Sequence, residues 1–92
     1  MNYTKEQLIK IDSNLLSVNI KAKEVLKVIR DGSEISNKDI SEETNLSKFV
    51  IDKCIAAFVG CGLITTIADG TTKYYRITEE GEKILNINRE GK

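Results

Sequence analysis

The feature that most constrains the fold is a change of sequence period at Gly62, inside the stretch LSKFVIDKCIAAFVGCGLITTI of residues 46–67. Before this glycine, apolar residues recur at the three- and four-residue spacing of an amphipathic helix, namely at Ile51, Ile55 and Phe58. After it, β-branched residues crowd a short run that ends at Asp69-Gly70, a strong signal for a hairpin turn. The order predicts a helix followed directly by a two-stranded hairpin.

Capping signals place the other elements along the chain. Thr4 with Gln7, and Ser36 with Asp39, have the spacing of capping boxes that begin helices. Gly32 is expected to end the second helix in the left-handed conformation. The predicted helices cover residues 5–17, 21–30, 37–44, 48–60 and 79–88, and the predicted hairpin covers residues 63–77.

The helices 37–44 and 48–60 are separated by a short turn, in which Asn45 is suited to a left-handed helix end and Ser47 to an N-cap. Two helices at this spacing are typical of a helix-turn-helix, and the hairpin that follows adds a wing. The predicted fold class is mainly α with a small β-hairpin, a winged helix-turn-helix. We expect one domain over residues 1–92, made of an N-terminal helical extension at 1–19, a winged-helix core at 20–78 and a C-terminal helix at 79–92.

Two separate motifs resemble one group of proteins. The stretch LSKFVIDKCIAAFVGCGLI, residues 46–64, resembles the recognition-helix segment of the MarR, PadR and ArsR-like transcriptional regulators. The stretch YRITEEGEKIL, residues 75–85, is similar to the Tyr-x-Leu-Thr-x-x-Gly-x-x-Leu signature that follows the wing in the same families, with Ile77 in place of Leu. The resemblance implies a winged-helix regulator that represses by occupying a promoter. Tyr75, which matches the Tyr of the signature, is expected to be the inner one of the two wing tyrosines.

The outward positions of helix 48–60 carry the functional prediction. Lys48 and Lys53 are suited to phosphate or guanine, Asp52 to the amino group of cytosine, and Phe49 only to thymine methyl groups. Because this surface has no Arg, Asn or Gln for bidentate base contacts, we expect weak sequence specificity or readout of DNA shape. The predicted DNA-binding residues are Lys38, Ser47, Lys48, Phe49, Asp52, Lys53, Thr71, Thr72 and Lys73.

Net charge gives no argument for nucleic acid, because 14 basic side chains balance 14 acidic ones. Residues 32–76 carry five basic and six acidic side chains. A binding face must therefore be local, and each lysine taken alone is equally well explained as a solvated surface charge. We expect one side to hold Lys38, Lys48, Lys53, Lys73 and Arg76, and another to hold Glu34, Glu42 and Glu43.

Phe49, beside Val50 and Cys54, supports a second interpretation. An exposed apolar patch is typical of protein-binding surfaces, and a winged helix also serves as an interaction module. The alternative function is therefore a protein-protein interaction module, in recruitment or as a replication accessory, that uses the apolar surface around Phe49.

Apolar residues in the first and last helices exceed what one small core should need. We expect them to form a homodimer interface that places two recognition helices about one DNA turn apart. The predicted dimerisation residues are Leu8, Ile11, Leu15, Leu16, Ile84 and Ile87.

Catalysis and metal binding find little support in the residues. The chain has no His and no Gly-rich phosphate loop, and Glu42 and Glu43 occupy consecutive helical positions that face different ways. Cys54 and Cys61 supply only two metal ligands, so we interpret them as reduced, partly buried thiols, with a redox or metal sensor as the alternative. We expect no enzymatic activity, no cofactor, no metal site and no small-molecule effector.

The expected location is the cytoplasm. No apolar run approaches the ~18 residues needed to span a bilayer. The first residues, Met-Asn-Tyr-Thr-Lys-Glu, lack the basic-then-apolar order of a signal peptide. The expected partner is double-stranded DNA, with no membrane contact.

Overall fold

The computed structural model describes residues 3–87 of the chain. Its elements follow one another as α1 (Lys5–Val18), α2 (Ala22–Gly32), α3 (Asn37–Thr44), α4 (Lys48–Gly60), β1 (Ile64–Asp69), β2 (Thr72–Ile77) and α5 (Glu79–Leu85). Every predicted element is present, and α3 and α4 have the predicted bounds. The last helix ends at Leu85, whereas its predicted end at residue 88 lies outside the described residues, as do residues 1–2 and 89–92.

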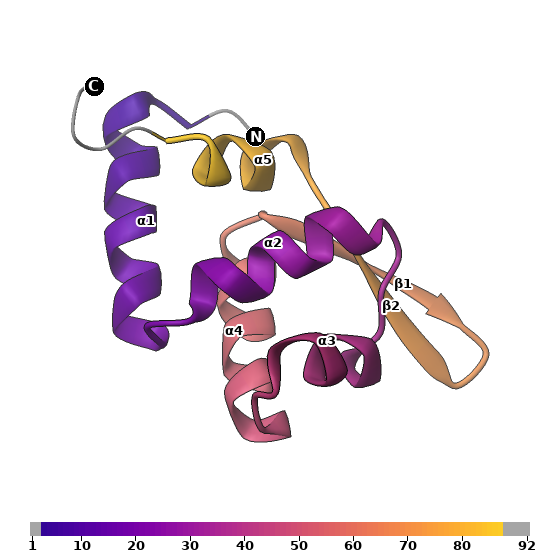
Figure 1. Ribbon diagram of the computed structural model, residues 1–92. Helices are drawn as coiled ribbons and strands as arrows, with labels where there is room; N and C mark the ends of the chain where they lie inside the picture. Colours follow the sequence, from indigo (N-terminus) through magenta and orange to yellow (C-terminus); the bar gives the residue numbers. More distant parts are fainter. Residues whose placement is uncertain (1–2, 88–92) are drawn as a thin grey trace.

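Helix α2 is the centre of the arrangement (Figure 1). It contacts the other four helices and strand β2. Helices α1 and α5 lie against each other, and the hairpin of β1 and β2 projects away from the helices. The helix-turn-helix of α3 and α4 and the wing are thus both anchored on one central helix.

The N-terminal caps form as predicted, because each capping side chain accepts from a backbone N–H that has no partner within its helix. Thr4 accepts from the N–H of Gln7 at 3.1 Å, and the side chain of Gln7 accepts from the N–H of Thr4 at 2.8 Å. Ser36 and Asp39 form the same reciprocal pair at the start of α3. Asn45 ends α3 in the left-handed conformation, with a φ of 61°.

The prediction that Gly32 ends α2 in the left-handed conformation is wrong. Gly32 is the last helical residue, and Ser33 takes the positive φ of 69° instead. A Cβ at position 32 would lie 2.8 Å from Cδ1 of Ile35. Glycine is therefore needed for the close approach of Ile35, which is buried, and not for the turn.

The wing is a short antiparallel hairpin in which Asp69 lies opposite Thr72 at the tip. At its base, Tyr75 is buried, as predicted. Its backbone exchanges two hydrogen bonds with Ile35, of 2.9 and 3.2 Å. This bridge fixes the wing to the segment that enters α3, so the wing and the helix-turn-helix keep a defined geometry.

The core lies around α2 and the inner face of α4. Its members from these two helices are Ala22, Val25, Leu26, Ile29, Ile51, Cys54, Ile55 and Phe58. The three α4 positions predicted from the apolar spacing are all among them. Burial of each large side chain contributes about 1.5 to 3 kcal/mol, so the inner face holds α4 in place and leaves its other side to solvent.

The apolar residues assigned to a dimer interface are mostly used within one chain. Leu8, Leu15 and Ile84 are buried in the core, and Ile11 and Ile87 are partly buried against it. The three buried residues are therefore not surplus to the core of one chain, contrary to the prediction. They are covered because α1 and α5 pack against each other and against the rest of the core. Of the six, Leu16 is exposed, at 47%.

Candidate nucleic-acid interface

The outer face of α4, defined as Lys48, Phe49, Asp52 and Lys53, is exposed along its whole length. The exposure of this face follows from the burial of the opposite face of the helix, as the helical spacing predicts. The first turn of α4 holds no acidic side chain, whereas the first turns of the other four helices each hold at least one. No negative charge in the first turn of α4 thus offsets the positive end of the helix dipole, and Lys48 in the same turn adds a further positive charge.

A groove of about 630 Å³ opens between the N-terminal ends of α3 and α4 and the wing. Its lining residues are Ser36, Asn37, Lys38, Lys48, Asp52, Thr71, Thr72, Lys73 and Tyr75. The groove therefore brings together six of the nine predicted DNA-binding residues, from three segments of the chain. We call it the basic groove, because three lysines and one carboxylate line it.

The other three predicted DNA-binding residues lie outside the lining of the basic groove. Ser47 accepts from the N–H of Val50 at 3.3 Å and so caps α4. Lys53 places Nζ 5.8 Å from the centre of the Phe49 ring, which is the geometry of a cation–π contact. Phe49 nevertheless keeps 72% of its surface exposed.

Asp52 already has two partners within the protein. Its Oδ2 accepts from Nζ of Lys48 at 2.8 Å, and its Oδ1 accepts from Nδ2 of Asn37 at 3.1 Å. The hydrogen bond from Lys48 holds the pKa of Asp52 below its ordinary value, and the same bond raises the pKa of Lys48. The predicted contact of Asp52 with cytosine would add a third hydrogen bond to a carboxylate that already accepts two.

Asn37 is the member of this cluster that sequence reasoning missed. It is the first residue of α3, and through Asp52 it joins α3 to α4. Its Oδ1 is buried and has no hydrogen-bond partner within residues 3–87. A polar residue at the start of a helix is unremarkable in a sequence, so only the packing of α3 beside α4 identifies its role.

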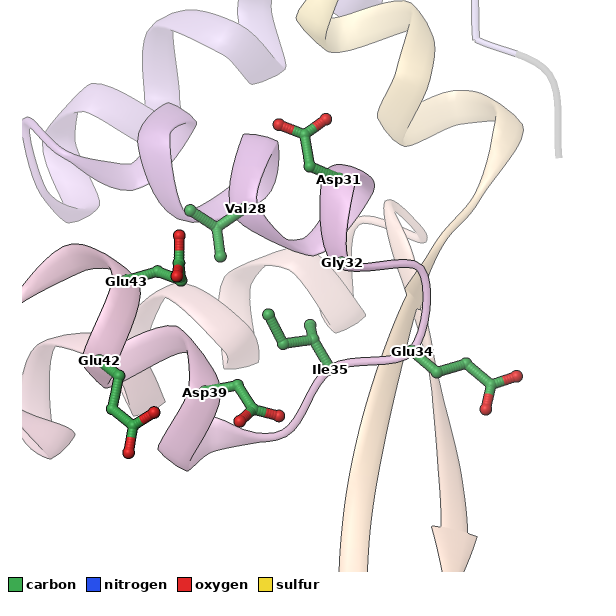
Figure 2. Close-up of a pocket in the computed structure, with 8 residues that line it drawn as sticks. All are labelled: Val28, Asp31, Gly32, Glu34, Ile35, Asp39, Glu42 and Glu43. Atoms are coloured by element: carbon green, nitrogen blue, oxygen red, sulfur yellow. The ribbon is translucent and has the colours of Figure 1, made fainter.

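Acidic side chains gather around a second hollow, of about 390 Å³, that shares no lining residue with the basic groove. Figure 2 shows it between α2, α3 and the loop that joins them, with Val28 and Ile35 at its centre. The lining residues are Val28, Asp31, Gly32, Glu34, Ile35, Asp39, Glu42 and Glu43. Arg76 is a correction to the expected division of charge, because it forms an ion pair with Glu34 instead of joining the lysines.

The apolar patch predicted around Phe49 is smaller than expected. Cys54 has no exposed surface and belongs to the core, and Val50 is partly buried against it. Spacing on a helix places Cys54 one turn and a fraction from Phe49, which turns the side chain of Cys54 toward the core. Phe49 is therefore the one fully exposed member of the predicted patch.

The two cysteines are both free thiols. Burial raises the pKa of Cys54, and Cys61 is partly exposed at the end of α4. Within residues 3–87, no group of three or more His, Cys, Asp or Glu side chains is arranged to hold a metal ion. No helix in the same range combines the length and the apolar character needed to cross a membrane.

Comparison with known proteins finds similarity among solved structures. No protein-family model matches the chain, and the search of curated proteins found no significant relative. An ArsR-like transcriptional regulator from Rhodococcus is 21% identical with a TM-score of 0.69, and the match covers 86% of this chain and 74% of that one. The homodimeric winged helix-turn-helix DNA-binding domain of a Mycobacterium bovis protein is 22% identical with a TM-score of 0.64, with 86% and 69% covered.

The multiple antibiotic-resistance repressor MarR from Listeria monocytogenes is 17% identical with a TM-score of 0.66. The match covers 82% of this chain and 54% of the repressor, so the chain spans about half the length of that regulator. The Rhodococcus protein is a transcriptional regulator, and the Listeria protein is a repressor. The resemblance predicted from two sequence motifs is therefore confirmed for the fold: the chain has the winged helix-turn-helix fold of MarR and ArsR-like regulators.

Proposed function

We propose that the protein binds double-stranded DNA as a small transcriptional regulator, with α4 in the major groove and the wing on the DNA backbone or in the minor groove. The observation that carries the proposal is the basic groove, where Lys38, Lys48 and Lys73 converge from α3, α4 and the wing. Three ammonium groups around one concave surface favour a polyanion, and lysines supply much of the contact to DNA phosphates.

The N-terminal end of α4 adds to the attraction for phosphate. Free backbone N–H groups and the helix dipole both favour an anion at the start of a helix. The first turn of α4 has no acidic side chain of its own to fill that place. A DNA phosphate in the basic groove would therefore meet the lysines and the positive end of α4 together.

Base readout by this surface is expected to be weak. The sequence of α4 contains no Arg, Asn or Gln, and Asp52 is engaged by Lys48 and Asn37. Phe49 is exposed and has the apolar ring that packs on thymine methyl groups. Selection by DNA shape, through the wing and the spacing of the phosphates, is the specificity that fits these residues best.

The proposal includes that the protein binds DNA as a homodimer. The M. bovis domain with the same fold is homodimeric, and a two-fold axis would place two α4 helices one DNA turn apart, ~34 Å. Leu16 and Ile20 are exposed apolar residues close in sequence at the end of α1 and just after it. The proposal also includes a cytoplasmic location, and it assigns no residue to a cofactor or a small-molecule effector.

The test is binding to a mixed-sequence DNA duplex, measured by fluorescence anisotropy at two salt concentrations. Micromolar or tighter binding that weakens steeply as salt rises is expected, because phosphate contacts release counterions. Folding of the sample is checked by circular dichroism. A folded protein that binds no duplex at low salt would contradict the proposal.

One observation favours a second candidate function. Phe49 exposes 72% of its surface on the outer face of α4, and exposed aromatic residues are frequent anchors of protein interfaces. The alternative is a protein-protein interaction module that uses Phe49, in recruitment or as a replication accessory. The absence of DNA binding by the folded protein would move the assignment to this alternative.

A further inference from the structure

Lys48 occupies an electrostatically unfavourable place in the free protein. It is the first residue of α4, where the helix dipole disfavours a cation, and its side chain is 83% exposed. Asp52 follows four residues later, so the pair runs from cation to anion along the helix, which is the less favourable order. The pair therefore adds little to the stability of α4, and an anion outside the chain explains Lys48 better.

Asp52 is nevertheless well placed to hold this lysine. Its two oxygens are divided between two partners, with Oδ2 at 2.8 Å from Lys48 and Oδ1 at 3.1 Å from Asn37. Asn37 belongs to α3, so the carboxylate is tied to a second helix and does not depend on Lys48 for its position. All three side chains line the basic groove.

We propose that Asp52 competes with DNA phosphate for Lys48 and thereby weakens sequence-independent binding in the basic groove. This inference rests on the proposed function. A phosphate that approaches Lys48 meets an ammonium group that already donates one of its three N–H groups to Oδ2 of Asp52. The carboxylate, which Asn37 also holds, offsets the charge of Lys48 and repels the phosphate. Asp52 is thus a positioning residue that acts through Lys48.

The consequence concerns specificity. Contacts to phosphates carry no sequence information, whereas contacts to base edges and sensitivity to DNA shape do. Weaker phosphate binding leaves a larger share of the affinity to the outer face of α4 and to shape. Weaker phosphate binding raises specificity most for a surface with few base-reading side chains, because non-specific binding would otherwise dominate its affinity for DNA.

The test compares wild type with Asp52→Asn, which keeps an oxygen for Asn37 and removes the charge that holds Lys48. Anisotropy with a mixed-sequence duplex should give about two- to fivefold tighter binding at low salt, the size of an exposed ion pair. The slope of log affinity against log salt should become steeper by about 1. Asp52→Ser, which also lacks the charge, should give the same gain.

Two controls separate this effect from a general loss of negative charge. In a Lys48→Ala background, Asp52→Asn is expected to give a much smaller gain, because the gain passes through the lysine. Glu43→Gln, which removes one negative charge from the acidic hollow, should leave affinity nearly unchanged.

The outcomes are distinct. An equal gain without Lys48, or no gain in either folded Asp52 variant, would overturn the inference while leaving the proposed function standing. Wild-type protein that binds no duplex at low salt would overturn the proposed function, and this inference with it.

Discussion

The inner and outer faces of α4 each carry a phenylalanine, in opposite surroundings. Phe58 on the inner face has no exposed surface, whereas Phe49 on the outer face exposes 72% of its surface. The inner face packs against α2 and the core, but the outer face makes contacts chiefly among its own residues, such as Lys48 with Asp52 and Lys53 with Phe49. The difference indicates that the inner residues serve stability and that the outer residues are free to serve binding.

Replacing each of the two phenylalanines tests this comparison with the largest expected effect on stability. Phe58→Ala should lower the free energy of unfolding by about 3 to 5 kcal/mol, because it removes a fully buried ring and leaves a cavity. Phe49→Ala is the matched control on the same helix and should cost no more than about 1 kcal/mol, the value of its contact with Lys53. Urea denaturation measures both, and equal losses would refute the division into two faces.

Two glycines extend the comparison from side chains to backbone. In α5, a Cβ at Gly81 would lie 2.6 Å from Cγ1 of Ile77 and press on the backbone of Leu63, so Gly81→Ala should destabilise the fold by about 1 to 3 kcal/mol. At the exposed end of α4, a Cβ at Gly60 would meet no packed neighbour in the described part of the chain. Gly60→Ala should therefore stabilise by about 0.4 to 1 kcal/mol, through the unfolded state.

Thermal melts followed by circular dichroism measure both glycine variants. A Gly81→Ala protein as stable as wild type would mean that α5 yields easily and is not held against the base of the wing. The packing that positions the wing beside α4 would then need a different explanation.

Local interactions made the elements predictable from sequence. The caps at Thr4, Ser36 and Ser47 depend on hydrogen bonds between residues three positions apart, so the sequence contains both partners. The inner face of α4 follows from helical spacing in the same way. The end of α2 was not predictable, because Gly32 is required by Ile35, whose approach depends on tertiary packing.

The site was predictable only in part. Sequence reasoning expected the basic residues on one side of the molecule, but the groove that Lys38, Lys48 and Lys73 share arises from how α3, α4 and the wing meet. The contact of Asn37 with Asp52 joins residues 15 positions apart, and no sequence pattern encodes it. The burial of Leu8, Leu15 and Ile84 was not predictable for the same reason, since a count of apolar residues does not tell which of them one chain buries.

Removing charge from the outer face should separate binding from stability. Lys48→Ala combined with Lys53→Ala should weaken binding to mixed-sequence DNA roughly tenfold and lower the salt slope by about 1 to 2. The melting temperature should stay unchanged, because both side chains are exposed. The matched control is Lys10→Ala with Lys27→Ala, which removes two exposed lysines from α1 and α2.

Anisotropy at several salt concentrations measures both double variants. An equal loss in the control would indicate that DNA responds only to total charge. An outer-face variant with wild-type affinity would show that the proposed recognition surface is wrong.

The smallest expected effect concerns Glu80, a buried carboxylate of α5. Glu80 accepts from the N–H of Tyr3 and from Nζ of Lys83, each at 3.2 Å. Burial alone would raise the pKa of Glu80, but these hydrogen bonds outweigh it and hold the pKa below its ordinary value. Because the folded-state pKa lies below the unfolded one, the ionised carboxylate stabilises the fold at neutral pH, and this contribution is lost as pH falls through the folded-state pKa.

Glu80→Gln should therefore lower the melting temperature at pH 7 and approach wild type toward about pH 3. Asp52→Asn is the matched carboxylate on the outer face, where the pKa is also lowered but water screens the charge. At pH 7, the melting temperature of Asp52→Asn should stay closer to that of wild type than the melting temperature of Glu80→Gln does. If Asp52→Asn lost as much stability as Glu80→Gln across this range, the exposed charges of α4 would share the structural role of the buried ones, and their assignment to binding would fail.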